Sequence, residues 1–251
     1  PSFTYITPGD RFVRLRVTDR VGASAITSVS VSVANTAPVP VILAPTTELR
    51  WSVGDLVAFS GGASDAEDGV LPASALKWDL VLIHANALDP TSTHTHVIES
   101  YVGVTDGTFN TPDHEFPSWL ELRLTATDAF GTSATTTMRL DPKTVQLNFA
   151  SLPAGLMIGF DGEAVAAPFS RTVIANSTNT ISAPPQLLDG QEWVFQSWSD
   201  GRDATHEVSA PQTDTTYTAS FYIPSGPQTP YNGTPAPIPG RIEAEDYDRG
   251  G

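Results

Sequence analysis

The sequence predicts an all-β protein that contains more than one β-sandwich. Apolar and polar residues alternate over several short segments, as in Leu120 to Ala126, where every second residue is apolar and the residues between are Glu121, Arg123 and Thr125. The 251 residues include 21 prolines and 19 glycines, and no long segment has helical periodicity. A third observation, an internal repeat of a predicted hairpin, indicates that there are several domains.

The repeat relates two strand–turn–strand segments, one within residues 13–33 and the other within residues 120–140. At a constant offset of 109 residues, Thr18-Asp19 matches Thr127-Asp128 and Gly22 matches Gly131. In each copy the Asp can bond to its own backbone and the Gly can adopt a positive φ, as a tight turn requires. This period is too long for a solenoid and equals the length of a β-sandwich, so we expect each copy of the hairpin to belong to a separate domain.

The alternating strand, the Thr-Asp pair, the Gly-containing turn and the Ser/Thr/Val-rich second strand resemble the last hairpin of a PKD-type immunoglobulin-like domain. The resemblance covers residues 1–142. It implies β-sandwiches of a kind that recurs in secreted bacterial carbohydrate-active and cell-surface proteins. Residues 1–35 are then the C-terminal strands of a truncated PKD-like domain, and residues 36–142 form a complete immunoglobulin/PKD-like sandwich.

Within the sandwich of residues 36–142, we expect strands at 56–59, 76–84 and 93–102 before the closing hairpin. The segment 76–84 alternates, and Trp78 in its middle resembles the core Trp of immunoglobulin-like domains. We therefore expect Trp78 to be buried.

Residues 143–222 predict a smaller β-rich module, in which Asp161-Gly162 marks a hairpin turn. The segments 194–201 and 215–221 resemble the small β-rich repeat modules of secreted bacterial proteins. Residues 223–239 contain six prolines and are expected to form an extended linker.

Residues 240–251 include the sequence IEAEDY, from Ile242 to Tyr247, which resembles the opening strand of a family 6-type carbohydrate-binding module. The resemblance implies that Glu243 and Glu245 help to hold a structural Ca²⁺ in the complete module. It also implies that polysaccharide or another glycan is the partner of that neighbouring module.

The composition argues against several partner classes. There are 28 acidic and 13 basic residues, and the formal charge of −15 is unfavourable for nucleic acid and for anionic membrane surfaces. No apolar run reaches the ~18 residues of a membrane span, so we expect no membrane insertion. The absence of cysteine fits a bacterial extracellular protein as well as a cytosolic one. The resemblances then favour a secreted, extracellular bacterial protein, which we expect to be monomeric.

Four of the five histidines lie in a short part of the chain, at His84, His94, His96 and His114. His94 and His96 project from the same face of a predicted strand, His84 ends the preceding strand, and the loop of His114 returns toward the same end. Imidazoles gathered in this way suit a divalent metal such as Zn²⁺. The alternative is a set of loop histidines bonded to backbone. A third interpretation, a cupin-like enzyme, rests on the spacing His94-x-His96-x-x-Glu99, but the second half of that motif is missing.

The acidic segment with Asp65, Glu67 and Asp68 could hold Ca²⁺ through carboxylate oxygens, although a polar turn closed by Gly69 explains it equally simply. Trp119 precedes the inward residue Leu120, so it is expected on the outward face, where an exposed ring can act as a platform for a sugar or cap a module interface. Trp193 and Trp198 have opposite parity, so at most one of them is expected to point outward.

No pattern of a nucleophilic or nucleotide-dependent enzyme is present, and the chain has no cysteine. The order of modules resembles the C-terminal region of secreted sugar dehydrogenases of the glucose/sorbosone type and of some glycoside hydrolases, whose catalytic domains would lie outside these residues. The sequence therefore predicts a non-catalytic accessory or spacer segment with a possible contribution to glycan binding. A metal-binding module, with Zn²⁺ or Ca²⁺ as its ion, is the alternative function.

Overall fold

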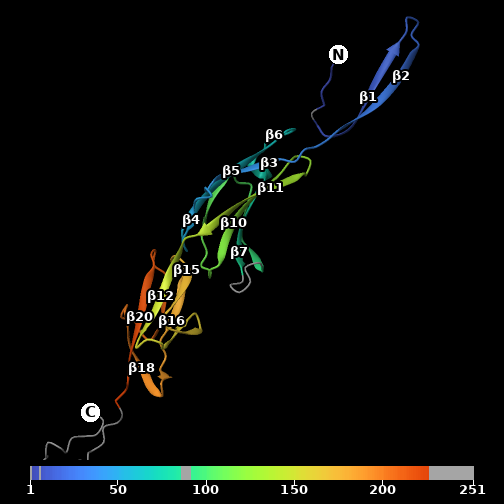
Figure 1. Ribbon diagram of the computed structural model, residues 1–251. Coiled ribbons are helices and arrows are strands. Elements are labelled where there is room, and N and C mark those ends of the chain that lie inside the picture. Colours follow the sequence, from blue (N-terminus) through green and yellow to red (C-terminus); the bar gives the residue numbers. More distant parts are fainter. Residues whose placement is uncertain (1, 6, 86–91, 226–251) are drawn as a thin grey trace, which may run out of the picture. The chain divides into compact units, whose positions relative to one another are not determined.

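A computed structural model describes residues 2–5, 7–85 and 92–225, and it confirms the all-β class. The described residues form twenty strands and a single short helical element, the 3₁₀ turn η1 (Ala73–Ala75), and none of them forms a helix that could cross a bilayer. The chain divides into two compact units, Pro1–Thr144 and Val145–Gly251, where the sequence predicts a boundary between residues 142 and 143 (Figure 1). The proline-rich linker and the IEAEDY sequence, with Glu243 and Glu245, lie outside the described residues.

The first unit begins with a hairpin of β1 (Gly9–Thr18) and β2 (Ser24–Val33), which pair only with each other. In this hairpin Leu15 pairs with Thr27, and 109 residues later Leu124 pairs with Thr136. The turns also agree, because Gly22 has a φ of 88° and Gly131 a φ of 89°. The two hairpins therefore repeat in register as well as in sequence.

The sandwich of the first unit has two sheets. One sheet has the order β4-β11-β10-β7-β8, and the other has the order β3-β5-β6 with β9 paired to β5. The strands of the first sheet are β4 (Arg50–Trp51), β7 (Leu76–Ala85), β8 (Thr93–Val102), β10 (Ser118–Thr127) and β11 (Ser133–Pro142). Those of the second are β3 (Val39–Ala44), β5 (Leu56–Asp65), β6 (Gly69–Val70) and β9 (Asp106–Asn110).

The core of this sandwich forms where the inward faces of the two sheets meet. Trp78 on β7 is fully buried, as the sequence predicts, and its ring lies 4.8 Å from that of Phe59 on β5. Its indole nitrogen donates to the carbonyl oxygen of Val104 at 3.1 Å. Trp51 on β4 is also fully buried and donates to the carbonyl oxygen of Leu140, so both large indoles have their polar atom paired. The immunoglobulin-like type of this sandwich stays a prediction.

The second unit has two sheets of its own, with the orders β15-β12-β20-β18-β17 and β14-β13-β16-β19. The strands of the first sheet are β12 (Thr144–Leu152), β15 (Phe169–Ile174), β17 (Gln186–Leu188), β18 (Gln191–Trp198) and β20 (Thr215–Tyr222). Those of the second are β13 (Met157–Phe160), β14 (Glu163–Ala166), β16 (Thr178–Ser182) and β19 (Thr205–Ser209). The predicted hairpin at Asp161-Gly162 joins β13 to β14, and both residues have a positive φ, as a type I′ turn requires.

Local sequence explains why apolar residues of the second unit meet in one core. Leu147 and Phe149 alternate along β12 and are buried together with Ile158 and Ile181 of the facing sheet. Trp198 is buried too, and Trp193 packs against the same core although their parity predicts opposite faces. A bulge between Phe195 and Ser197 shifts the register of β18, and this extra residue brings both indoles to one side.

Candidate metal centre

The histidine cluster lies at one end of the β4-β11-β10-β7-β8 sheet. His84 stands next to the end of β7 and pairs with His94 on β8 and with Ser118 on β10. Cross-strand partners share a face of a sheet, and His96 is two residues from His94, so all of these side chains project from one face. The loop from Asn110 to Ser118 returns to this end, because the amide of Ala85 donates to the carbonyl oxygen of Pro117 at 3.0 Å.

The four imidazole rings gather around His84, as the strand parity predicts. The ring centroid of His84 lies 5.3 Å from those of His94 and His96 and 4.8 Å from that of His114. The Nε2 atoms of His84 and His96 are 3.2 Å apart. The ring of His84 is therefore in contact with the rings of the other three histidines.

Glu115 adds a carboxylate to the cluster. Among the residues that the structure describes, His84, His114 and Glu115 are the one group of three whose potential ligand atoms all lie within 4.8 Å of one another. The side chain of His114 is largely covered, whereas that of Glu115 is 79% exposed and lies 3.7 Å from His114 through its Oε2. The carboxylate can thus reach the imidazoles from the solvent side.

The environment of His84 favours its neutral form. Burial lowers the pKa of His84 below its usual 6.5, and the charges of His114, His94 and His96 act in the same direction while Glu115 opposes them. A neutral imidazole keeps a lone pair on one nitrogen, which is what a metal ion requires.

Ser118 is a feature of this site that the sequence does not reveal. It is 2% exposed, and its Oγ has no hydrogen-bond partner among the described residues although it lies directly across from His84. A buried hydroxyl without a partner is uncommon, and this one can donate to or accept from a ligand that binds beside His84. The only sequence signal is a Ser at an inward position of β10, where the following inward residues are Leu120, Leu122 and Leu124.

The cupin-like spacing does not produce a cupin-like set of ligands. The carboxylate of Glu99 accepts a hydrogen bond from the hydroxyl of Tyr101, and it is not in the group with His84 and His114. Burial, together with the hydrogen bond and charge of Glu99, raises the pKa of Tyr101 to about 12. In the β7–β8 ladder Glu99 pairs with Leu80, whereas His96 and His94 pair with Leu82 and His84, so Glu99 lies farther along the strand from the imidazole cluster.

The acidic segment forms a closed turn in which each of the three carboxylates accepts at least one hydrogen bond, although the buried Oδ2 of Asp65 has no partner among the described residues. Asp65 accepts from the amides of Glu67 and Asp68, both at 2.9 Å. Glu67 accepts from Thr36, and Asp68 accepts from the amide of Ala129 at 2.9 Å. The sequence places this segment in a loop, whereas Asp65 ends β5 and Gly69 begins β6. Calcium binding by Asp65, Glu67 and Asp68 stays a prediction, and the contacts favour the polar turn.

Trp119 is half-buried on β10, and Arg139 of β11 covers its ring, with the guanidinium carbon 4.1 Å from the ring centroid. The cation–π contact covers one face of the ring, so a sugar cannot stack on that face. These contacts do not favour the predicted carbohydrate platform at Trp119.

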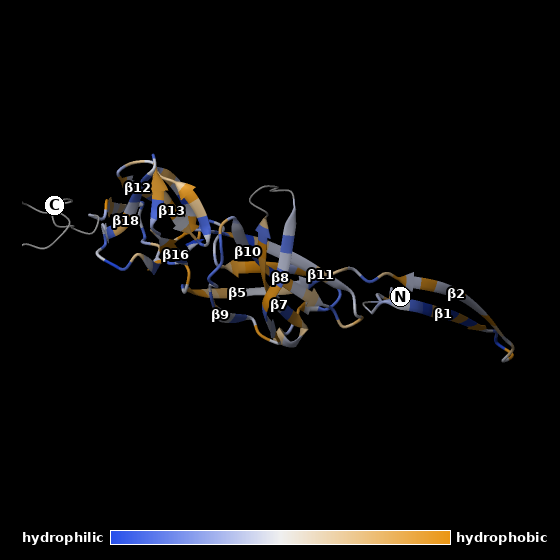
Figure 2. Ribbon diagram, turned by 90° about the horizontal axis from the view of Figure 1, so that it is seen from below, coloured by the Kyte–Doolittle hydropathy of each residue, from blue (hydrophilic) through white to orange (hydrophobic). Residues whose placement is uncertain are grey.

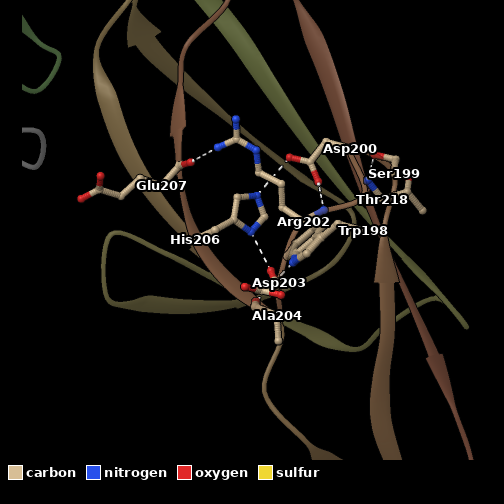
Figure 3. Close-up of polar contacts among 9 residues, drawn as sticks. All are labelled: Trp198, Ser199, Asp200, Arg202, Asp203, Ala204, His206, Glu207 and Thr218. Carbon is tan, nitrogen blue, oxygen red and sulfur yellow. Dashed lines mark hydrogen bonds and ion pairs between the residues drawn. The ribbon is translucent and has the colours of Figure 1, made fainter.

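The fifth histidine, His206, has an oxygen beside each of its ring nitrogens, whereas in the cluster the Nδ1 of His114 lies 3.2 Å from the carbonyl oxygen of Glu115. Its Nδ1 lies 2.7 Å from the carbonyl oxygen of Asp203, and its Nε2 lies 3.0 Å from the Oδ2 of Asp200 (Figure 3). In the same turn, Arg202 donates to the carbonyl oxygen of Glu207, and the indole of Trp198 donates to that of Ala204. Both nitrogens of His206 face oxygen acceptors of the turn, so neither is left for a ligand.

No known family model and no curated protein matches the chain. Among solved structures, one that it resembles is a Ca²⁺-stabilized adhesin that helps an Antarctic bacterium reach out and bind ice, with 14% sequence identity and a TM-score of 0.21. The match covers 82% of this chain and 57% of the adhesin chain, so this chain spans little more than half the length of that relative. At this TM-score the likeness carries no functional conclusion.

Proposed function

We propose that the chain is a non-catalytic accessory segment of a secreted, multimodular, carbohydrate-active bacterial protein, in which an immunoglobulin-like sandwich and a smaller β module act as a spacer. The neighbouring module, whose opening strand the IEAEDY sequence resembles, would bind the glycan. The function of the described sandwiches is then to hold neighbouring modules apart.

The observation that carries this proposal is the parallel pairing of the first and last strands of the second unit. In the second unit, the first strand β12 runs parallel to the last strand β20, from Leu147–Thr215 to Leu152–Ser220. In the first unit, the last strand β11 runs parallel to β4, the second strand of the sandwich, whereas the first strand β3 pairs antiparallel with β5. When the entering and leaving strands are parallel neighbours, the chain leaves a sandwich at the end opposite to its entry. Such modules add length when they are linked in series.

The segment that joins the β1–β2 hairpin to the first sandwich is held by side-chain contacts. The amide nitrogen of the Asn35 side chain donates to Asp128 and to Thr132, both at 2.6 Å. Thr36 donates from its amide and its hydroxyl to Glu67, at 3.2 and 2.6 Å. The acceptors lie in the β10–β11 and β5–β6 turns at one end of the sandwich, so the segment with Asn35 and Thr36 is fixed to that end. A fixed joint suits a spacer better than a freely jointed linker does.

Two measurements on the purified chain test the proposal. A compact 251-residue globule has a radius of gyration of about 18 Å, whereas a serial spacer should give a clearly larger value in small-angle X-ray scattering. In affinity electrophoresis through gels that contain soluble xylan or β-glucan, the chain should migrate as it does in plain gels. A radius near that of a globule would contradict the spacer, and retardation that the Trp119→Ala variant abolishes would favour glycan binding by the first unit.

A further inference from the structure

We propose that the first unit binds one Zn²⁺ ion at the end of its sandwich, through His84, His96 and His114, with Glu115 as the carboxylate ligand. This site goes beyond the spacer function, and either proposal can fail without the other. The site combines two strand histidines, which fix its position, with two loop residues, which close it.

The ring nitrogens of the two strand histidines, His84 and His96, already have the separation that zinc requires. Zn–N bonds of about 2.0–2.1 Å in a tetrahedral site place two ligand nitrogens ~3.3 Å apart. The Nε2 atoms of His84 and His96 are 3.2 Å apart. Their rings are nearly parallel, at 12°, and both residues stand on paired strands of one sheet. A small ion can therefore bind between these nitrogens while the strands keep their register.

The loop pair approaches His84 from another direction. His114 and Glu115 offer ligand atoms within 4.8 Å of each other and of a ring nitrogen of His84. The 4.8 Å limit allows separations wider than a tetrahedral edge of ~3.3 Å, and His96 lies outside this group, so the proposal requires His114 and Glu115 to approach His84 and His96 more closely on binding. They can do so because they precede β10 in a loop, and because the side chain of Glu115 is mostly exposed.

The donor set selects the class of ion. Imidazole nitrogens with one carboxylate suit Zn²⁺ and neighbouring transition metals, whereas Ca²⁺ and Mg²⁺ take oxygen ligands. His94 packs edge-on against His84 at 5.3 Å and supports the ring without being required as a ligand. The unpaired hydroxyl of Ser118, across from His84, can hydrogen-bond a water on the ion.

The experiment measures binding of ZnCl₂ to the chelator-treated full chain by isothermal titration calorimetry, with CaCl₂ as the comparison ion. CoCl₂ provides a spectroscopic test, because tetrahedral Co²⁺ absorbs strongly in the visible. We expect one Zn²⁺ per chain, no displacement by Ca²⁺, and a visible Co²⁺ spectrum that Zn²⁺ abolishes. His84→Ala, His96→Ala and His114→Ala should each weaken Zn²⁺ binding at least about tenfold, since even outer-shell changes cost that much.

His206→Ala is the matched control, because it removes a histidine whose two nitrogens are already bonded in the second unit. It should leave the stoichiometry and affinity of Zn²⁺ unchanged. The loop variants His114→Ala and Glu115→Gln keep the test valid if a strand variant fails to fold, since neither residue belongs to a strand. The proposal is overturned if the wild-type chain binds no Zn²⁺, or if the loop variants bind it as the wild type does.

Discussion

At the scale of single residues, two tryptophans on neighbouring strands differ in burial because their side chains project from opposite faces of the sheet. Trp78 on β7 lies in the core against Phe59, and its nitrogen is paired with the carbonyl oxygen of Val104. Trp119 on β10 lies on the other face under the guanidinium of Arg139. The indole of Trp78 therefore fills part of the core, whereas the indole of Trp119 packs on the outer face of the sheet.

We expect Trp78→Ala to lower the free energy of unfolding of the first unit by about 3–5 kcal/mol, as for other buried aromatic residues. Trp119→Ala should lower it much less, because solvent can occupy the vacated surface. Urea titrations of both variants, compared with the wild type, give the two values. A larger loss for Trp119→Ala would mean that the faces of β7 and β10 are assigned the wrong way round.

Asp128 couples the stability of the first unit to pH. Burial favours its protonated form, but hydrogen bonds from Asn35 and from the amides of Thr132, Phe130 and Gly131 outweigh burial and lower the pKa of Asp128 below its usual 3.8. The folded pKa is thus below the unfolded one. This contribution to stability is therefore complete above the unfolded pKa and disappears as pH falls through the folded one.

The unfolding temperature of the first unit should fall as the pH decreases below about 4, and the fall should be smaller in Asp128→Asn. Thermal melts between neutral pH and about pH 2 measure the difference. Asp19→Asn is the matched control, because Asp19 accepts hydrogen bonds from the equivalent amides, those of Val21 and Ala23, in a hairpin outside the sandwich. An equal pH dependence in wild type and Asp128→Asn would refute the coupling.

At the scale of elements, two adjacent glycines in β5 differ in whether the neighbouring residues leave room for a side chain. A Cβ at Gly61 would lie 2.9 Å from the ring of Trp78 and would also meet the carbonyl oxygen of Val41, whereas a Cβ at Gly62 would meet nothing within 4 Å. The absence of a side chain at Gly61 is thus what allows Trp78 to lie against the strand.

Gly61→Ala should cost about 1–3 kcal/mol of unfolding free energy, the usual range for overpacking a core. Gly62→Ala should be neutral or slightly stabilising, by up to ~1 kcal/mol, because it restricts the unfolded chain. Chemical denaturation of the pair measures both effects in one strand. Equal costs would show that the strand, and not the Trp78 contact, requires glycine.

The β1–β2 hairpin repeats β10–β11 without the partners that bury it. Leu15 is 60% exposed, whereas the equivalent Leu124 is fully buried, and the neighbouring Val13 and Val17 are also exposed. Figure 2 shows apolar segments along this hairpin as well as along the sandwich strands. A two-stranded hairpin without a covered face is marginally stable in water.

In the chain as it stands, amides of β1 and β2 should exchange with solvent at least about 100-fold faster than those of β10 and β11, since local opening costs them little. Hydrogen–deuterium exchange with mass spectrometry resolves the two hairpins, which have the same register and turn and so serve as each other's control. Equal protection would show that something covers the apolar face of the first hairpin.

The sequence predicts best those elements whose alternation is long and self-contained. The strand at 93–102 and the Asp161-Gly162 hairpin have the predicted positions, and the convergence of the histidines followed from the parity of two antiparallel neighbours. β9 and β19 were missed, because each has little apolar periodicity and forms by pairing with a distant strand. The cover of Trp119 by Arg139 and the unpaired Ser118 depend on cross-strand register, which no local pattern encodes.

At the scale of the whole molecule, a zinc site in one unit should leave the other unit unaffected. Zn²⁺ at about 100 times its dissociation constant adds about 2.7 kcal/mol to the stability of the unit that binds it. That stabilisation slows amide exchange through global opening by roughly 100-fold in β7, β8 and β10, and should leave β12 and β20 unchanged. Exchange in the presence and absence of ZnCl₂ measures this, and equal slowing in both units would mean that they unfold together.

The parallel pairing of an early strand with the last strand also determines how each unit responds to tension. If the two ends of the chain are pulled apart, β12 and β20 slide along each other, so the hydrogen bonds of their ladder share the load and must fail together. The β12–β20 ladder spans six residue pairs, whereas β4 and β11 share two. Under a rising force the first sandwich should therefore yield before the second, and the protein would lengthen in two steps while its second unit still transmits the load.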